Sequence, residues 1–161
     1  MKKLLIVILL AACCLSLKAQ LAENGIMTVK DLMSLAQKDN LSTVQEAVAT
    51  KGYKSRGGKS VISKCFAKDC TLNGSNQVTA ISNTNTASTV NYSPDDGGIS
   101  VTVFSEDNLN SLLEQLAEEG FEETDASGTM KTYRKQGAIA FFHLLTYKVG
   151  DDNGYALMYN P

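Results

Sequence analysis

The order of local patterns constrains the fold of this chain most, because helical spacing gives way to strand spacing twice. Two short helical patterns, around 28–36 and 42–52, precede strand-like segments around 61–66, 88–92 and 99–104. A stronger helical pattern over 105–120 then precedes strand-like segments around 121–124, 130–135, 139–149 and 155–159. Helices followed by runs of strands, without alternation of the two, predict an α+β fold with an antiparallel sheet and helices on one face.

Polar residues mark where these helices begin. Thr28 with Asp31 and Ser42 with Gln45 have the spacing of a capping box. Ser105 is an N-cap residue followed by two acidic residues, which favour a helix N-terminus. The sequence therefore predicts helix starts at these three positions.

The two halves also share glycines at helix ends and turns before their final strands. Gly52-Tyr53 and Gly120-Phe121 each follow a helical pattern, and turns at 95–98 and 151–154 each precede a final strand. We therefore expect two tandem related units, each a helix or helix pair followed by an antiparallel sheet of about three to four strands. The first unit would span 20–104, with an Asn/Ser/Thr-rich insertion at about 68–88, and the second 105–161. In element order, and not in any residue motif, this layout resembles the tandem helix-plus-four-strand units of the β-lactamase-inhibitor-protein type.

The first 19 residues have the layout of a bacterial export signal. Lys2 and Lys3 precede an apolar run from Leu4 to Leu15, and small residues follow. The run is shorter than the roughly 20 residues that a membrane-spanning helix needs. A cut after Ala19 would release a protein that works in the periplasm or outside the cell.

A second way of processing this segment stays open. The residues before Cys13, Leu-Ala-Ala, resemble the bacterial lipobox, in which the cysteine is acylated and becomes the first residue. That cut would hold the protein on a membrane through its lipid chains. We favour the soluble form, because a cut after Ala19 leaves a single pair of cysteines and no further thiol.

Charge narrows the classes of partner. Removing 1–19 leaves twelve Lys and Arg against 17 Asp and Glu, a net charge near −5. A mildly acidic chain without a basic cluster argues against binding to nucleic acid, and it favours membrane association only through a lipid at Cys13.

The two remaining cysteines, Cys65 and Cys70, are five positions apart. In an oxidising compartment this pair predicts a disulfide that clips a loop or hairpin at the base of the insertion. A zinc site would need four N/S ligands, whereas the chain has one His, so we predict no metal and no cofactor.

Residues with catalytic potential do not form a recognisable centre in the sequence. His143 is the only histidine and lies in a strand-like segment without an identifiable nucleophile. The acidic residues from Glu114 to Asp125 have the pattern of a solvated helix face and its exit. We therefore predict a protein that is not an enzyme, and a small hydrolase with carboxylates that the sequence does not place is kept as an alternative.

The last two strands are apolar on both faces. Pairing them groups Phe142, Leu144, Tyr155, Leu157 and Tyr159 on one face and leaves Phe141, His143, Leu145, Tyr147, Val149 and Met158 on the other. One face can rest on helices. The other face needs a different cover, which is either the first unit, the N-terminal segment or a second copy of the chain, or else an external partner. The sequence thus predicts an exported binding protein that uses Phe141, His143, Tyr147 and Met158 to contact another protein or an envelope component. A lipid-anchored structural protein of the envelope, acylated at Cys13, is the first alternative.

Overall fold

The structure is a computed structural model that describes residues 21, 23–38, 40–56 and 64–161. Its helices are α2 (Val29–Ala36), α3 (Leu41–Thr50) and α4 (Glu106–Glu118). Helix α2 begins with the predicted capping box, in which the Asp31 N–H donates to Thr28 Oγ1 at 3.2 Å. The predicted start of α3 at Ser42 is wrong, because the N-cap is Asn40, whose side chain accepts from the Ser42 N–H at 2.9 Å.

The strands form one large sheet and one small hairpin. The large sheet contains β1 (Lys54–Arg56), β2 (Lys64–Lys68), β5 (Ser88–Tyr92), β6 (Ile99–Val103), β7 (Glu122–Ser127), β8 (Met130–Arg134), β9 (Phe141–Val149) and β10 (Asp152–Asn160). The hairpin consists of β3 (Cys70–Leu72) and β4 (Val78–Ile81). With three helices in the described residues and antiparallel pairing throughout, the fold is α+β, as predicted.

The predicted division into two separate sheets is wrong. The eight strands form a continuous sheet in the order β1-β2-β5-β6-β10-β9-β8-β7. Strands β6 and β10 pair from Val103–Tyr155 to Ile99–Tyr159 at its centre. In two separate sheets, β6 and β10 would both be edge strands with a row of unpaired N–H and C=O groups, and their pairing removes both of these edges.

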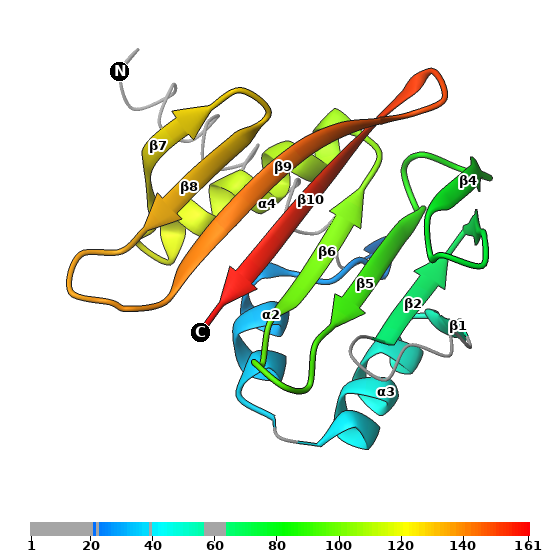
Figure 1. The fold of residues 1–161 in the computed structure, drawn as a ribbon, viewed down its shortest axis with the longest axis horizontal. Coiled ribbons are helices and arrows are strands. Elements are labelled where there is room, and N and C mark those ends of the chain that lie inside the picture. Colours follow the sequence, from blue (N-terminus) through cyan, green and yellow to red (C-terminus); the bar gives the residue numbers. More distant parts are fainter. Residues whose placement is uncertain (1–20, 22, 39, 57–63) are drawn as a thin grey trace, which may run out of the picture.

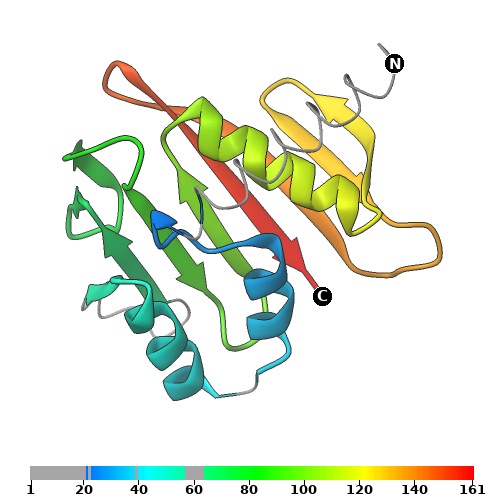
Figure 2. The same cartoon turned by 180° about the vertical axis from the view of Figure 1, so that it is seen from behind.

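All three helices lie on one face of the sheet (Figures 1 and 2). Alternation along the strands sends every second side chain toward these helices. In the two central strands the helix-side residues are Ile99, Val101, Val103, Tyr155, Leu157 and Tyr159, all buried in the main core. The predicted grouping of apolar residues on the two faces of β9 and β10 agrees with the observed register.

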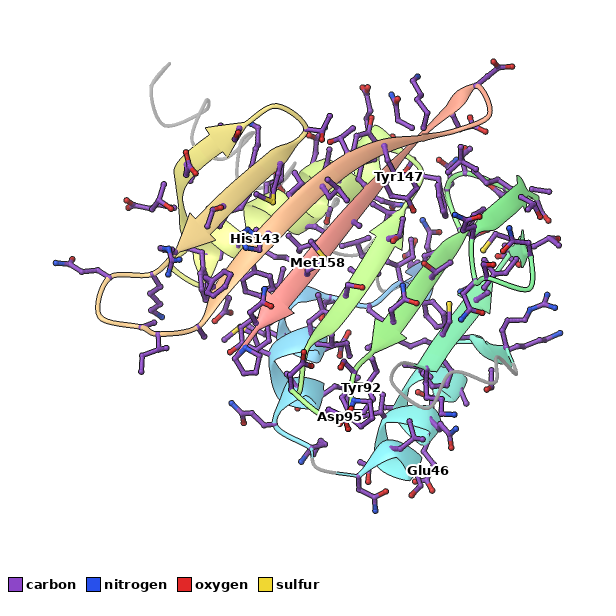
Figure 3. The ribbon with its side chains drawn as sticks, in the orientation of Figure 1. Glu46, Tyr92, Asp95, His143, Tyr147 and Met158 are labelled. Carbon is purple, nitrogen blue, oxygen red and sulfur yellow. The ribbon has the colours of Figure 1, made fainter. Side chains whose placement is uncertain are left out.

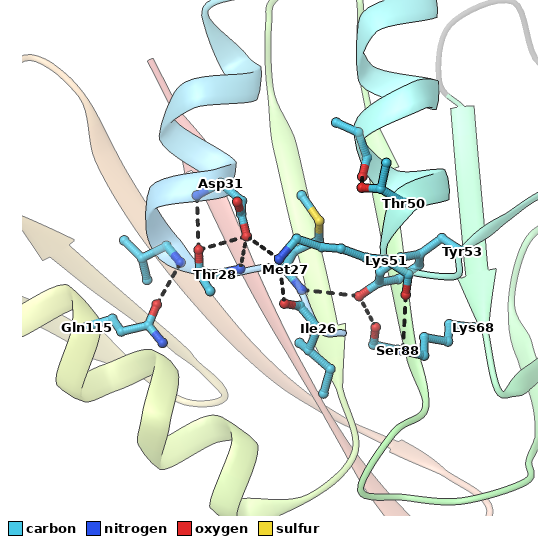
Figure 4. A network of polar contacts seen from close by, with 12 residues as sticks. Ile26, Met27, Thr28, Asp31, Thr50, Lys51, Tyr53, Lys68, Ser88 and Gln115 are labelled. Carbon is cyan, nitrogen blue, oxygen red and sulfur yellow. Dashed lines mark hydrogen bonds and ion pairs between the residues drawn. The ribbon is translucent and has the colours of Figure 1, made fainter. Parts of the chain in front are cut away.

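A polar network ties the helix layer to the sheet (Figure 4). Lys51 Nζ lies 2.9 Å from Asp31 Oδ2 and donates to the Ile26 carbonyl at 3.3 Å. The buried Tyr53 hydroxyl accepts from the Met27 N–H at 3.4 Å and bonds the Ser88 hydroxyl. These bonds satisfy polar groups that would be costly to bury unpaired.

The predicted exposed insertion contains the β3–β4 hairpin. Leu72, Val78 and Ile81 pack against a small second core of Ala67, Cys70, Ala87 and Phe104. Because Ala67 and Phe104 lie on the sheet face opposite the helices, the hairpin covers one end of that face. The Asn/Ser/Thr-rich composition concealed this anchoring, since only a few apolar residues provide it.

Candidate functional site: the open face of the sheet

The face of the sheet opposite the helices carries the candidate site, and we call it the open face. Its central residues follow from the register of β5, β6, β10 and β9, which places alternate side chains away from the helices. They are Thr89, Asn91, Ser100, Thr102, Gly154, Ala156, Met158, Phe141, His143, Leu145 and Tyr147. None of the described helices packs on this face (Figure 1).

The four predicted contact residues all lie on the open face. Met158 is directly opposite His143 in the β9–β10 ladder, and Phe141 is two positions from His143 on β9. Tyr147 is four positions further along β9, about 13 Å from His143 at the usual rise per residue. All four side chains are half-buried, and Figure 3 shows His143, Met158 and Tyr147 across the two strands.

One half of the open face is an aromatic cluster on β8 and β9. The Arg134 guanidinium lies 4.6 Å from the centre of the Phe141 ring, which meets the His143 ring edge-on at 4.8 Å. Thr132 Oγ1 is 3.1 Å from His143 Nδ1. We call Arg134, Phe141, His143 and Met158 the apolar patch. The sequence reasoning missed Arg134, because its place beside Phe141 depends on the β8–β9 register.

The Thr132–His143 contact is the kind of hydroxyl–imidazole pair that nucleophilic catalysis uses. Such a reaction also needs room for a substrate and donors for a developing oxyanion. Neither residue lines any of the three hollows found among the described residues. Thr132 is buried, so the bond fixes the orientation of the His143 ring in the patch.

The other half of the open face is a polar groove of about 560 Å³. Its floor includes Thr89, Asn91 and Thr102, and its walls come from the β3–β4 hairpin and the end of β9. Its lining residues are Asn76, Gln77, Val78, Thr89, Asn91, Thr102, Leu145, Tyr147, Lys148, Val149 and Gly150. A smaller hollow of about 170 Å³ shares Asn91 and reaches Met158, so it joins the groove to the apolar patch.

Tyr147 is held in place at the wall of the groove. A Cβ atom on Gly154 would lie 2.8 to 3.1 Å from three atoms of the Tyr147 ring, so the ring lies across this glycine. Burial raises the pKa of the Tyr147 hydroxyl, although the nearby Thr102 side chain works in the other direction. The ring is thus a fixed wall and a neutral hydrogen-bonding group at physiological pH.

The structure holds Cys65 and Cys70 as buried free thiols, and the disulfide between them stays a prediction. Cys70 follows Asp69, whose φ of 50° turns the chain between β2 and β3, and its Sγ is directed at the Ser88 carbonyl at 3.7 Å. Burial, followed by the proximity of Cys70, raises the pKa of the Cys65 thiol to about 11. Both thiols are therefore protonated and poorly nucleophilic.

Comparison with protein-family models, with curated proteins and with solved structures finds no match for this chain. Evidence for its function therefore comes from its own residues.

The predicted signal segment and Cys13 lie outside the described residues. In the part of the chain that the structure describes, no helix has the length and apolar character needed to cross a membrane. The same part contains no group of three or more His, Cys, Asp and Glu side chains arranged to hold a metal ion.

Proposed function

We propose that this protein is an exported, non-catalytic binding protein that captures another protein through the open face. The observation that carries the proposal is the apolar patch, which lies on a sheet face that no described helix covers. The opposite face of β9 and β10 lies beneath the helices, and its apolar side chains are in the core: Phe142, Leu144, Tyr155, Leu157 and Tyr159.

The composition of the patch fits a protein partner. Aromatic residues, Met and Arg are the residue types enriched in the buried centres of protein interfaces. Phe141, Met158 and Arg134 are of these types, and the Arg134–Phe141 contact preorganises two of them. The flexible Met158 side chain can adapt to a partner surface.

Export is part of the proposal and has its own test. Intact mass of the protein from its native host distinguishes a chain that begins at Gln20 from one acylated at Cys13. The first mass supports the soluble binding protein, whereas a diacylated or triacylated mass would establish the lipid-anchored alternative.

Capture through the patch can be tested with a matched pair of variants. Met158→Glu places a charge in the patch, and Ile139→Glu makes the same kind of change at an apolar residue that is 89% exposed in the β8–β9 connection. Both proteins would be immobilised, exposed to host periplasmic extract and culture medium, and checked for native circular dichroism. We expect Ile139→Glu to retain the proteins captured by the wild type and Met158→Glu to lose them. Equal capture by folded Met158→Glu would refute the proposal.

We further propose that the two halves arose as related units within the single sheet. Each half is an antiparallel meander, β1-β2-β5-β6 and β7-β8-β9-β10, and the final strands of the two meet at the centre. This arrangement is what an approximate twofold relation between two helix-plus-four-strand units would produce.

The helix ends support this relation in detail. Gly52 has a φ of 87° and Gly120 one of 82°. The Tyr53 N–H donates to the Val48 carbonyl at 3.2 Å, and the Phe121 N–H to the Leu116 carbonyl at 2.9 Å. Both bonds join residues five positions apart, and each follows a glycine in the left-handed conformation that ends the helix.

A lysine then reaches back to each helix end. Lys68 Nζ donates to the Lys51 carbonyl at 3.1 Å, and Lys135 Nζ donates to the Glu119 carbonyl at 2.8 Å. Lys68 Nζ also donates to the Asn24 carbonyl. If the ends are equivalent, Lys68→Met and Lys135→Met should each remove one bond to terminal helix carbonyls. Urea unfolding should then show destabilisation of about 0.5–1.5 kcal/mol for Lys135→Met and at least as much for Lys68→Met, which also loses the bond to Asn24. A clear effect at one end only would contradict the equivalence.

A further inference from the structure

The polar groove differs from the apolar patch in the chemistry it offers. Six of its lining side chains end in an amide or a hydroxyl: Thr89 and Thr102 are buried in the floor, and Asn76, Gln77, Asn91 and Tyr147 are the more accessible ones. Lys148 is the single charged residue in the lining, and no carboxylate is present there. Because amides and hydroxyls both donate and accept, the set matches a ligand whose own groups do the same.

The position of the groove limits how a ligand can bind. Its floor lies on strands β5 and β6, which are paired on both sides in the middle of the sheet. Their backbone N–H and C=O groups are already used in the ladders, so a peptide cannot add to the sheet here as an extra strand. A ligand must therefore bond to the side chains of the floor and walls.

The Tyr147 ring supplies a flat apolar surface beside these groups. One face of the ring lies across Gly154, and the hydroxyl end lies near the Thr102 side chain. Val78, Leu145 and Val149 add apolar surface to the walls. A volume of about 560 Å³ lies within the usual range for small-molecule sites.

We propose that this groove binds a short neutral carbohydrate, with the Tyr147 ring against the C–H face of one sugar and Asn91 and the neighbouring side chains bonded to its hydroxyls. The site is separate from the patch that would capture a protein. Lys148 is exposed at the rim, where its ammonium group can donate hydrogen bonds to the ligand.

Titration of the isotope-labelled mature protein with cellotriose, maltotriose and tri-N-acetylchitotriose, followed by amide chemical shifts, tests the proposal. At least one sugar should shift the resonances of the groove residues in a saturable way. Asn91→Leu should weaken that binding at least tenfold, and Tyr147→Leu should do the same by removing the ring. Asn160→Leu is the matched control, because Asn160 lies on the same face and lines the smaller hollow but not the groove.

Three results would overturn the carbohydrate site. The first is the absence of saturable shifts with all three sugars. The second is unchanged affinity in both folded groove variants. The third is binding of a neutral Gly-Ser-Gly-Ser peptide with none of the sugars, since this would assign the groove to a peptide. Loss of protein capture by Met158→Glu would leave all three measurements unaffected, so the two proposals fail separately.

Discussion

Substitution of Gly154 by alanine tests how the Tyr147 ring is held. The new methyl group would meet the ring at 2.8 to 3.1 Å, closer than carbon atoms approach without a shift. Gly154 is not among the glycines with positive φ, so the backbone itself tolerates alanine. Relieving the overlap requires the ring to move away from Gly154.

The expected magnitude follows from two opposing effects. Inserting a methyl group into a packed contact costs about 1–3 kcal/mol. Replacing glycine in a strand recovers about 0.5–1 kcal/mol, because the unfolded chain becomes less flexible. We therefore expect Gly154→Ala to lower the free energy of unfolding by about 0.5–2 kcal/mol.

Urea unfolding of a double-mutant cycle with Tyr147→Ala measures the coupling. Without the ring, Gly154→Ala should be neutral or stabilising by up to about 1 kcal/mol. Gly74→Ala is the matched control, since a Cβ there meets nothing within 4 Å. If Gly154→Ala cost the same free energy with and without the Tyr147 ring, the packing argument would be refuted.

Three further predictions concern titratable groups. Burial tends to raise the pKa of Asp31, but bonds from Thr28 and Lys51 hold this pKa below its ordinary value. The ionised carboxylate therefore stabilises the fold above about pH 4, and this stabilisation is lost as the pH falls through the lowered pKa. Asp31→Asn should reduce the acid sensitivity of urea unfolding and lower the free energy of unfolding at pH 7 by about 0.5–1 kcal/mol. Because burial raises the pKa of Cys65 above its value in the unfolded chain, ionisation of this thiol destabilises the fold, with no loss below about pH 9 and an increasing loss toward pH 11. Cys65→Ala should therefore reduce the loss of unfolding free energy near pH 10.5 by about 2 kcal/mol. Iodoacetamide should alkylate Cys65 and Cys70 slowly in the folded protein and rapidly in urea without reductant, as judged by mass; two residues that stay unmodified in urea would instead indicate a disulfide.

Local patterns in the sequence predicted the helices and the faces of the last two strands well. Capping residues such as Thr28 and Ser105 act within one helical turn, so their effect can be read from neighbouring residues. Likewise, strict alternation fixes which side of β10 carries Leu157 and which carries Met158.

Pairing between distant strands could not be predicted in the same way. The β6–β10 ladder joins residues more than 50 positions apart, and nothing within either strand specifies the other as its neighbour. The groove was missed for the same reason, because Gln77 and Tyr147 come together only when the hairpin and β9 meet over the sheet. The cysteine spacing likewise says nothing about the turn at Asp69, which lies between the two thiols.

The central β6–β10 pairing also sets the order of folding events. Strand β10 follows every other strand in the chain, yet it fills a position between β6 and β9 in the middle of the sheet. A chain that emerges with its N-terminus first therefore keeps β6 as an open edge, with its apolar side chains partly uncovered, until residues 152–160 have emerged. Closure of the central ladder is a long-range, late and slow step, and until then the growing chain is most exposed to pairing with the wrong strand.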